Sequence, residues 1–221
     1  MLNRIKTKLG VKNNADKVSF WFIRHGQSES NVLGSECLVM NDAPLTERGT
    51  DEARSMARYF KENNINVTDV YTSPLGRSHQ TAEVIAKELG LSVKVKDGLK
   101  ERDWGIWRDL PWDEVANKLS GMDINERYSF VPENGESWQQ MERRLFDVLE
   151  EIAEENSAGE NILIVTHRGC LRAILPVLAK ASHDKHEDFS VETGSLTKFS
   201  FDKESFEFVG LVPYTQSKNE Q

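Results

Sequence analysis

Apolar residues along this chain follow two patterns. In some segments they form short, nearly continuous runs, and in others single apolar residues recur every three or four positions. Residues 18–23 (VSFWFI) form a run of the first kind, and Asn161–Thr166 (NILIVT) form the clearest one. Such runs, rich in β-branched and aromatic residues, are typical of buried strands. Further strands are predicted over residues 67–72, 93–95, 196–201 and 206–211.

Segments with helical spacing separate most of these strands. Ala53, Met56, Ala57 and Phe60 stand at positions i, i+3, i+4 and i+7, which lie on one face of a helix. The pattern therefore predicts an amphipathic helix after the first strand. Further helices are predicted over residues 81–89, 137–156 and 170–179.

The order of these elements predicts an α/β fold. Strands that alternate with helices build a mostly parallel sheet, because each helix carries the chain back to the same edge. We therefore expect a three-layer sandwich with a central sheet and helices on both faces. The last two strands follow each other too closely for a helical crossover, so an antiparallel strand is expected there.

A single domain is predicted over residues 18–213, with a flexible N-terminal arm over 1–17 and a polar tail over 214–221. The least regular stretch is 104–132. Two interpretations of it remain open. In the first, it is a lid or substrate-facing insertion that accepts an apolar leaving group. In the second, it is a surface loop that is packed by its own aromatic residues. Those aromatic residues are Trp104, Trp107, Trp112 and Phe130.

Composition narrows the classes of function. The 221 residues include 28 Lys and Arg against 36 Asp and Glu, a net charge of −8. This balance argues against nucleic-acid and anionic-membrane partners but allows a local basic pocket. Two cysteines, Cys37 and Cys170, make no disulfide framework. No apolar run reaches the roughly 20 residues of a membrane helix, and the first 17 residues lack the apolar core of a secretory signal, so a cytoplasmic protein is expected.

Histidine and arginine recur where predicted strands end. Arg24 and His25 follow the first strand, Arg77 comes shortly after the second, and His167 and Arg168 follow Asn161–Thr166. In open α/β sheets, sites form beyond the carboxyl ends of the strands, so these side chains are expected to meet at one edge.

This set suits phosphoryl transfer. Guanidinium groups bind phosphate oxygens with paired, charge-assisted hydrogen bonds, and a neutral imidazole can take a phosphoryl group onto nitrogen. A second imidazole can stabilise the charge of the transition state. Gly26 is expected to let the backbone approach the anion. A metal site is disfavoured, because the neighbours of the histidines are cations.

Six segments together resemble the histidine phosphatase superfamily, the phosphoglycerate mutase-like fold. They span about two thirds of the chain and stand in the family's order. The resemblance implies that His25 is the nucleophile and that Arg24, Arg77 and His167 complete a phosphate pocket, with Asn31 as a further member. The segments are FIRHGQSESN (22–31), PLTERG (44–49), YTSPLGRSHQTAE (71–83), LKERDWGIW (99–107), NGES (134–137) and VTHRGCLR (165–172).

Glu101 matches the position of the family's acid. The resemblance implies that it protonates the departing alkoxide and then helps to activate water, and that neither a metal nor another cofactor is needed. Arg102, which is also found in the mutases of the family, is a candidate for substrate binding. Arg168 departs from the family's usual glycine after the second histidine. Its side chain either points away from the pocket, which we favour, or adds a third cation for an anionic substrate.

Three functions remain open. Hydrolysis of a phosphate monoester, with inorganic phosphate as product, is favoured over phosphoglycerate mutase activity, which would use 2,3-bisphosphoglycerate. Mutases of the family carry a long insertion after the acid, whereas 35 residues separate Glu101 from Glu136 here. A non-catalytic protein that binds a phosphorylated ligand is the third alternative. The oligomeric state is undetermined, and a homodimer stays open.

Overall fold

The computed structural model of the chain describes residues 17–33, 42–186, 188–189, 191–202 and 205–212. The predicted N-terminal arm as far as residue 16, Cys37 and the predicted polar tail lie outside the described residues.

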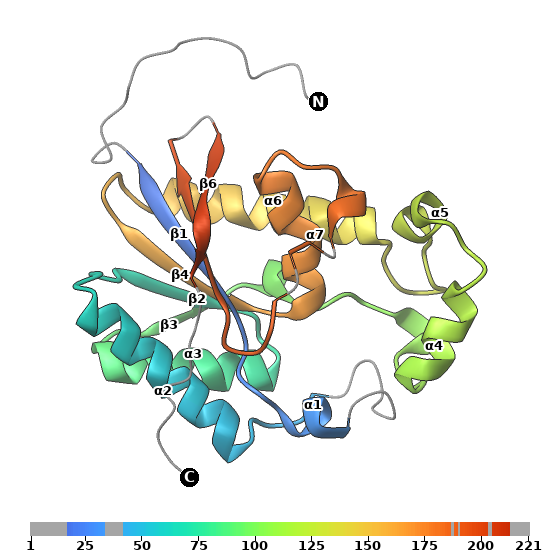
Figure 1. Cartoon of the computed structure of the whole chain (residues 1–221), viewed down its shortest axis with the longest axis horizontal. Helices are drawn as coiled ribbons and strands as arrows, with labels where there is room; N and C mark the ends of the chain where they lie inside the picture. Colours follow the sequence, from blue (N-terminus) through green and yellow to red (C-terminus); the bar gives the residue numbers. More distant parts are fainter. Residues whose placement is uncertain (1–16, 34–41, 187, 190, 203–204, 213–221) are drawn as a thin grey trace.

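A mixed sheet forms the centre of the molecule (Figure 1). Its strands are β1 (Val18–Arg24), β2 (Asp69–Thr72), β3 (Val93–Val95), β4 (Asn161–Thr166), β5 (Leu196–Phe201) and β6 (Phe206–Val212). They lie in the order β3-β2-β4-β1-β5-β6. β4 pairs in parallel with β1 and β2, and β2 in parallel with β3. β5 is antiparallel to both of its neighbours, β1 and β6. The sheet is thus mostly parallel with one reversed strand, as predicted.

Helices cover both faces of the sheet. α2 (Glu47–Glu62) and α3 (Gly76–Leu89) lie on one face, and α6 (Trp138–Glu155) and α7 (Arg168–Leu178) lie on the other (Figure 1). Side chains of β1 alternate between the two layers. Phe20 and Phe22 belong to the core under α6 and α7, whereas Trp21 and Ile23 belong to the core under α2 and α3. This arrangement confirms the predicted three-layer sandwich.

Two helices begin earlier than their apolar spacing predicted. α3 begins at Gly76 rather than at residue 81, and α7 begins at Arg168 rather than at residue 170. The first turn of α3 turns polar side chains inward, and there the Ser78 hydroxyl donates to the carbonyl oxygen of Val165 over 2.9 Å. Such inward-facing polar residues are invisible to a search for apolar periodicity.

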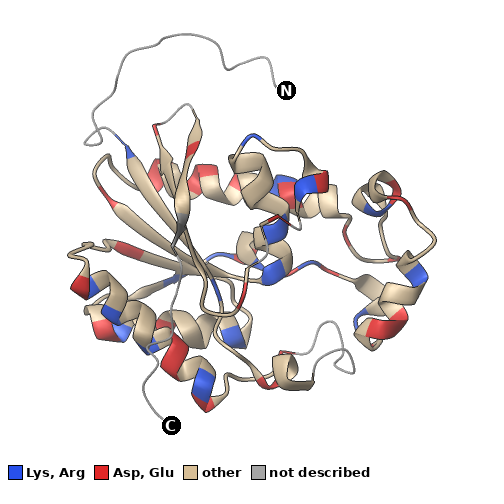
Figure 2. Cartoon of the chain, viewed as in Figure 1, with Lys and Arg blue, Asp and Glu red and all other residues tan. Residues whose placement is uncertain are grey.

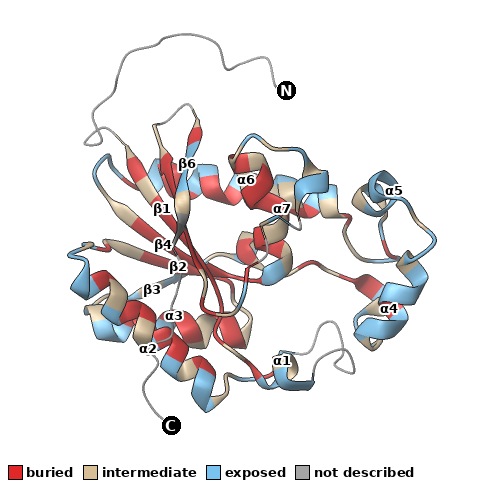
Figure 3. Ribbon diagram, viewed as in Figure 1, coloured by how far each residue is buried: buried red, intermediate tan, exposed pale blue. Residues whose placement is uncertain are grey.

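The 104–132 stretch, predicted to be the least regular, contains helices. These are a 3-10 turn (η5, Gly105–Trp107), α4 (Trp112–Leu119) and α5 (Ile124–Ser129). Asp123 caps α5 through the backbone N–H groups of Asn125 and Glu126. Figure 3 shows that α4 and α5 are mostly exposed and lie apart from the buried centre of the sheet. Ring contacts hold the stretch together, because Trp107 stacks on Phe130 with centroids 5.1 Å apart.

Candidate active site

His25 lies directly beyond the carboxyl end of β1 and is buried. Its Nδ1 atom is 2.8 Å from the carbonyl oxygen of Gly26. Because a carbonyl oxygen can only accept, the proton belongs on Nδ1, and the lone pair remains on Nε2. The Nε–H of Arg77 donates to that Nε2 over 3.1 Å. The Nε2 lone pair of His25 therefore accepts from the guanidinium group that the sequence predicted for phosphate binding.

His167 reaches the same place from the end of β4. Its ring centroid lies 5.3 Å from that of His25, and the side chain is fully buried. Nε2 lies 2.8 Å from the hydroxyl oxygen of Ser73, which follows β2. Within the described residues, Nδ1 of His167 is buried without a hydrogen-bond partner. A phosphoryl oxygen would satisfy such an atom, and buried polar atoms are rarely left unsatisfied.

The two predicted arginines frame the histidines. Arg24 donates from Nη1 to the carbonyl oxygen of Val191 over 3.0 Å, and its buried Nε has no partner in the described part of the chain. Burial, followed by the charge of Arg168, lowers the pKa of Arg24 to about 10, so the group remains a cation at neutral pH. Arg77 lies 3.4 Å from a carboxylate oxygen of Asp42. Three strand ends thus converge on one cationic pocket, as the sequence predicted.

Both histidines are neutral at pH 7. Burial first, and then the guanidinium of Arg77, lower the pKa of His25 well below its usual value of 6.5. Burial first, and again Arg77 next, lower the pKa of His167 in the same way. An imidazolium ion has no lone pair for attack, so a depressed pKa keeps the candidate nucleophile competent well below neutral pH.

The neutral state of both imidazoles can be tested by titration. In a proton NMR titration of the free protein, we expect the ring protons of His25 and His167 to keep their chemical shifts as the pH falls through 6.5. The signals are assigned by their loss in His25→Gln and His167→Gln. A titration midpoint at or above 6.5 for either ring would contradict the account.

Glu101 lies where the first turn of α7 begins. One carboxylate oxygen accepts the backbone N–H of Gly169 over 3.0 Å, and the other accepts the N–H of Arg102 over 2.9 Å. A helix N-terminus presents unpaired N–H groups and a positive dipole end, so it is a natural seat for a carboxylate. The predicted acid therefore has a fixed position beside the turn that carries His167.

Gly169 leaves the space that this carboxylate occupies. A Cβ atom built on Gly169 would lie 2.2 Å from a carboxylate oxygen of Glu101. We expect Gly169→Ala to displace the flexible Glu101 side chain without unfolding the protein. The variant should lower kcat about tenfold on esters with poor leaving groups, which is less than the ~10²–10⁴-fold that a general acid contributes, because Glu101 is displaced and not removed. Steady-state kinetics with unchanged thermal unfolding would support this, and unchanged kcat would contradict it.

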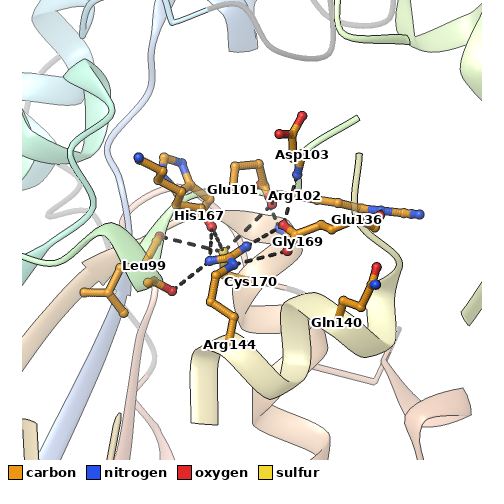
Figure 4. A network of polar contacts seen from close by, with 12 residues as sticks. Leu99, Glu101, Arg102, Asp103, Glu136, Gln140, Arg144, His167, Gly169 and Cys170 are labelled. Atoms are coloured by element: carbon orange, nitrogen blue, oxygen red, sulfur yellow. Dashed lines mark hydrogen bonds and ion pairs between the residues drawn. The ribbon is translucent and has the colours of Figure 1, made fainter. Parts of the chain in front are cut away.

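Further side chains, missed by the sequence analysis, hold the Glu101 segment (Figure 4). The Arg144 guanidinium donates to the carbonyl oxygens of Gly98 and Lys100 over 2.7 and 3.0 Å. It also pairs with Glu136, whose carboxylate accepts the backbone N–H of Asp103 over 3.0 Å. Glu136 belongs to the NGES segment, so the resemblance pointed to it without giving it a role. No local signal marked Arg144 or Ser73.

A cavity of about 760 Å³ opens beside this pocket. Its wall includes Glu101 and Asn31, and Asn31 also accepts hydrogen bonds from the backbone and hydroxyl of Ser28. Figure 2 shows Lys and Arg along α7 and along the segment that leads from the sheet to α4. Arg168 is exposed and borders the cavity, and its charge contributes to lowering the pKa of Arg24, which supports a third cation near the pocket over the orientation that the sequence analysis favoured. The arginines and tryptophans of the wall are Arg24, Arg48, Arg102, Arg168, Arg172, Trp104, Trp112 and Trp138.

Two further residues named from the sequence make hydrogen bonds within the protein. Arg102 lines the cavity, yet its guanidinium donates to the carbonyl oxygens of Phe130 and Glu136 over 2.9 and 3.0 Å. The expectation for Gly26 is wrong, because its N–H donates to the Thr81 hydroxyl instead of facing an anion. Glycine is needed there for packing, since a Cβ atom would lie 2.3 Å from the carbonyl oxygen of Gly49.

Metal-binding groups and Cys170 bear on alternative chemistry. Within the described residues, no group of three or more His, Cys, Asp or Glu side chains is placed to hold a metal ion. Burial raises the pKa of the Cys170 thiol, which donates to the carbonyl oxygen of Lys100 over 2.9 Å. A thiol in this state is a poor nucleophile.

No helix in the described part of the chain is both long and apolar enough to cross a membrane.

Comparison with known proteins gives a family match over most of the chain. The model of the histidine phosphatase superfamily (branch 1) matches residues 20–212. The chain is 31% identical over 179 residues to the 2,3-bisphosphoglycerate-dependent phosphoglycerate mutase of Methylobacterium radiotolerans, covering 78% of this chain and 84% of that protein.

The chain is also similar in sequence to a second kind of enzyme and in structure to a phosphatase. The chain is 29% identical over 160 residues to human 6-phosphofructo-2-kinase/fructose-2,6-bisphosphatase 4, covering 71% of this chain but 32% of that longer protein. The alpha-ribazole phosphatase structure from Shigella flexneri superposes with a TM-score of 0.74 at 24% identity, covering 87% of this chain and 95% of that one. At this identity the structural similarity concerns the fold alone.

Proposed function

Because this chain belongs to the histidine phosphatase superfamily, we propose that it hydrolyses phosphate monoesters through a phosphohistidine intermediate on His25. The convergence of His25, His167, Arg24 and Arg77 on one buried cationic pocket supports this chemistry. Arg24 and Arg77 supply positive charge, and these arginines and His167 supply hydrogen-bond donors for a phosphoryl group, so the proposed steps use no metal ion.

In the first step, the Nε2 lone pair of His25 attacks phosphorus, and the bond between phosphorus and the ester oxygen breaks. The hydrogen bond from Nδ1–H to Gly26 keeps the lone pair on Nε2. Arg77, 3.1 Å from Nε2 in the resting pocket, would instead face the phosphoryl oxygens once phosphorus occupies that position. Arg24 and His167 would contribute the buried Nε and Nδ1 atoms that have no partner among the described residues.

In the same step, Glu101 as a carboxylic acid gives its proton to the departing oxygen, which leaves as an alcohol. The carboxylate of Glu101 then accepts a proton from water while the water oxygen attacks phosphorus. The bond from phosphorus to Nε2 breaks, its electron pair returns to His25, and inorganic phosphate leaves. The wall position of Glu101 supports both roles, because it borders the cavity that alcohol and water would share.

The cavity is the observation that carries the choice of a phosphatase over a mutase. A mutase must protect phosphohistidine from water, whereas a 760 Å³ cavity bordered by Glu101 has room for water next to a three-carbon substrate. Segment length distinguishes the two activities less well than the sequence suggested, since this chain covers 84% of a relative named as a mutase.

The contacts of the basic residues in the 101–136 segment also favour a phosphatase over a mutase. In the mutases of the family, such residues hold the second charged group of the substrate. Here only Arg102 among them lines the cavity, and its guanidinium is engaged by two backbone carbonyls. The others are Arg108, Lys118 and Arg127, which contact Asp103, the ring of Trp107 and the carbonyl of Met122.

The direct test is turnover in EDTA with p-nitrophenyl phosphate and 3-phosphoglycerate. We expect release of inorganic phosphate without added metal. Isomerisation of 3-phosphoglycerate that requires 2,3-bisphosphoglycerate, with no phosphate release, would make the protein a mutase. Binding of phosphate with neither reaction would favour a non-catalytic binding protein.

A further inference from the structure

The cavity next to the phosphate pocket is larger and more basic than a phosphoryl group requires. Five arginines line it against two carboxylates, Glu101 and Glu192, although the whole chain carries a net charge of −8. Its volume of about 760 Å³ lies within the range of sites that enclose drug-sized ligands. A bare phosphate ester of a small alcohol would leave most of this space and charge unused.

From this wall we propose that the alcohol part of the substrate carries a flat aromatic group, bound against Trp112, and a second negative charge, bound by Arg168. The proposal rests on the proposed phosphatase function and specifies its class of substrate.

Trp112 presents an aromatic surface to the cavity. It is 43% exposed, although tryptophan is one of the side chains that gain most from burial. Trp104 meets it in an edge-to-face contact at 5.7 Å and is in turn covered by the Arg102 guanidinium, 4.1 Å from its ring centre. Trp112 is thus oriented by a fixed neighbour while its remaining surface stays open, which suits stacking of a flat group.

The neighbouring aromatic residues of the same stretch differ in this respect. Trp107 and Phe130 stack on each other at 5.1 Å and do not line the cavity. One aromatic pair, Trp107 and Phe130, therefore packs the segment, and another pair, Trp104 and Trp112, borders the cavity.

Arg168 supplies the second recognition element. It is the first residue of α7, directly after His167, and its exposed side chain lines the cavity. Within the described residues it has no hydrogen-bonded or ion-paired partner. Arg48, by contrast, is paired with Glu52 over 3.0 Å. The Arg168 charge is also felt in the pocket, because it contributes to lowering the pKa of Arg24. An anionic group on the substrate would relieve this repulsion between cations.

A set of substrates that varies the ring and the charge separately tests the proposal. Phenyl phosphate has the ring, 3-phosphoglycerate has the charge, 4-carboxyphenyl phosphate has both and glycerol 3-phosphate has neither. 1,4-Phenylene bisphosphate replaces the carboxylate by phosphate and distinguishes the two kinds of anion. The readout is kcat/KM for each substrate with wild type, Arg168→Ala and Trp112→Ala, expressed as variant-to-wild-type ratios so that leaving-group reactivity cancels.

We expect Arg168→Ala to lower kcat/KM about 10-fold or more further for charged substrates than for their uncharged counterparts, as for loss of a charged hydrogen bond. Arg168→Lys should restore part of this difference. Trp112→Ala should lower kcat/KM about 3- to 10-fold further for aryl than for alkyl esters, the range of an aromatic contact, and Trp112→Phe should lose less. Arg58→Ala, an exposed arginine on α2, is the matched control.

Equal losses on all substrates, or no losses, would overturn this assignment while leaving the phosphatase function intact. Failure of the wild type to hydrolyse any of the substrates would instead overturn the proposed function on which the assignment rests.

Discussion

Replacing His25 by alanine is expected to abolish phosphate release, with kcat falling on the order of 10⁴-fold or more, as is typical when the nucleophile of a covalent mechanism is removed. The imidazole is the group whose unprotonated Nε2 accepts a hydrogen bond from Arg77 inside the pocket. Without it, water must attack the ester directly, and the remaining pocket can only bind and polarise the phosphoryl group. The measurement is metal-free turnover of p-nitrophenyl phosphate.

The fold should survive this change, so the loss can be assigned to chemistry. The His25 ring makes two hydrogen bonds, to the carbonyl oxygen of Gly26 and from the Nε–H of Arg77, and packs in a polar pocket instead of the apolar core. Far-UV circular dichroism should be unchanged. His79→Ala is the matched histidine control, since His79 is paired with Glu83 on α3, away from the pocket, and should retain activity. Substantial turnover by His25→Ala would rule out the phosphohistidine mechanism.

Glu101→Gln is expected to have the second-largest effect, and this effect depends on the leaving group. The amide keeps the shape of the side chain but cannot give up a proton, so alkyl phosphates should lose about 10²–10⁴-fold in kcat. p-Nitrophenyl phosphate should lose much less, because its leaving group departs as a stable anion. The measurement is kcat for both esters with each protein.

Glu151→Gln provides a matched control, because Glu151 is an exposed carboxylate that pairs with Lys96 on the surface. It should leave both substrates unaffected. Equal losses on the alkyl and aryl esters in Glu101→Gln would argue that Glu101 organises the pocket through Gly169 and Arg102 and is not the proton donor.

The parts of the site that the sequence predicted correctly depend on backbone topology. Continuous apolar runs located the strands, and a parallel sheet brings the residues that follow those strands to one edge. His25 and His167 therefore came together as predicted, with ring centroids 5.3 Å apart. Arg77 joined them even though its helix begins earlier than predicted, because the turn after β2 is short.

The missed features depend on side-chain geometry that no local pattern encodes. Arg144 reaches the Glu101 segment across 44 residues of sequence to bind the Lys100 carbonyl. Gly26 is required by its close approach to the backbone of Gly49, which becomes visible only once both segments are placed. The sequence analysis favoured an Arg168 side chain that points away from the pocket, but the direction depends on the turn between the end of β4 at Thr166 and the start of α7, which no local pattern encodes.

The central claim is that the phosphoryl group passes through a covalent bond to His25, and trapping that species tests it most directly. Protein mixed with substrate is quenched in alkali, in which phosphohistidine persists, then digested and mapped by mass spectrometry. The account predicts a phosphoryl group on the peptide that contains His25, stable in alkali, lost in acid and absent from His25→Ala. Turnover by wild type with no such phosphopeptide, or with the phosphoryl group on another residue, would contradict it.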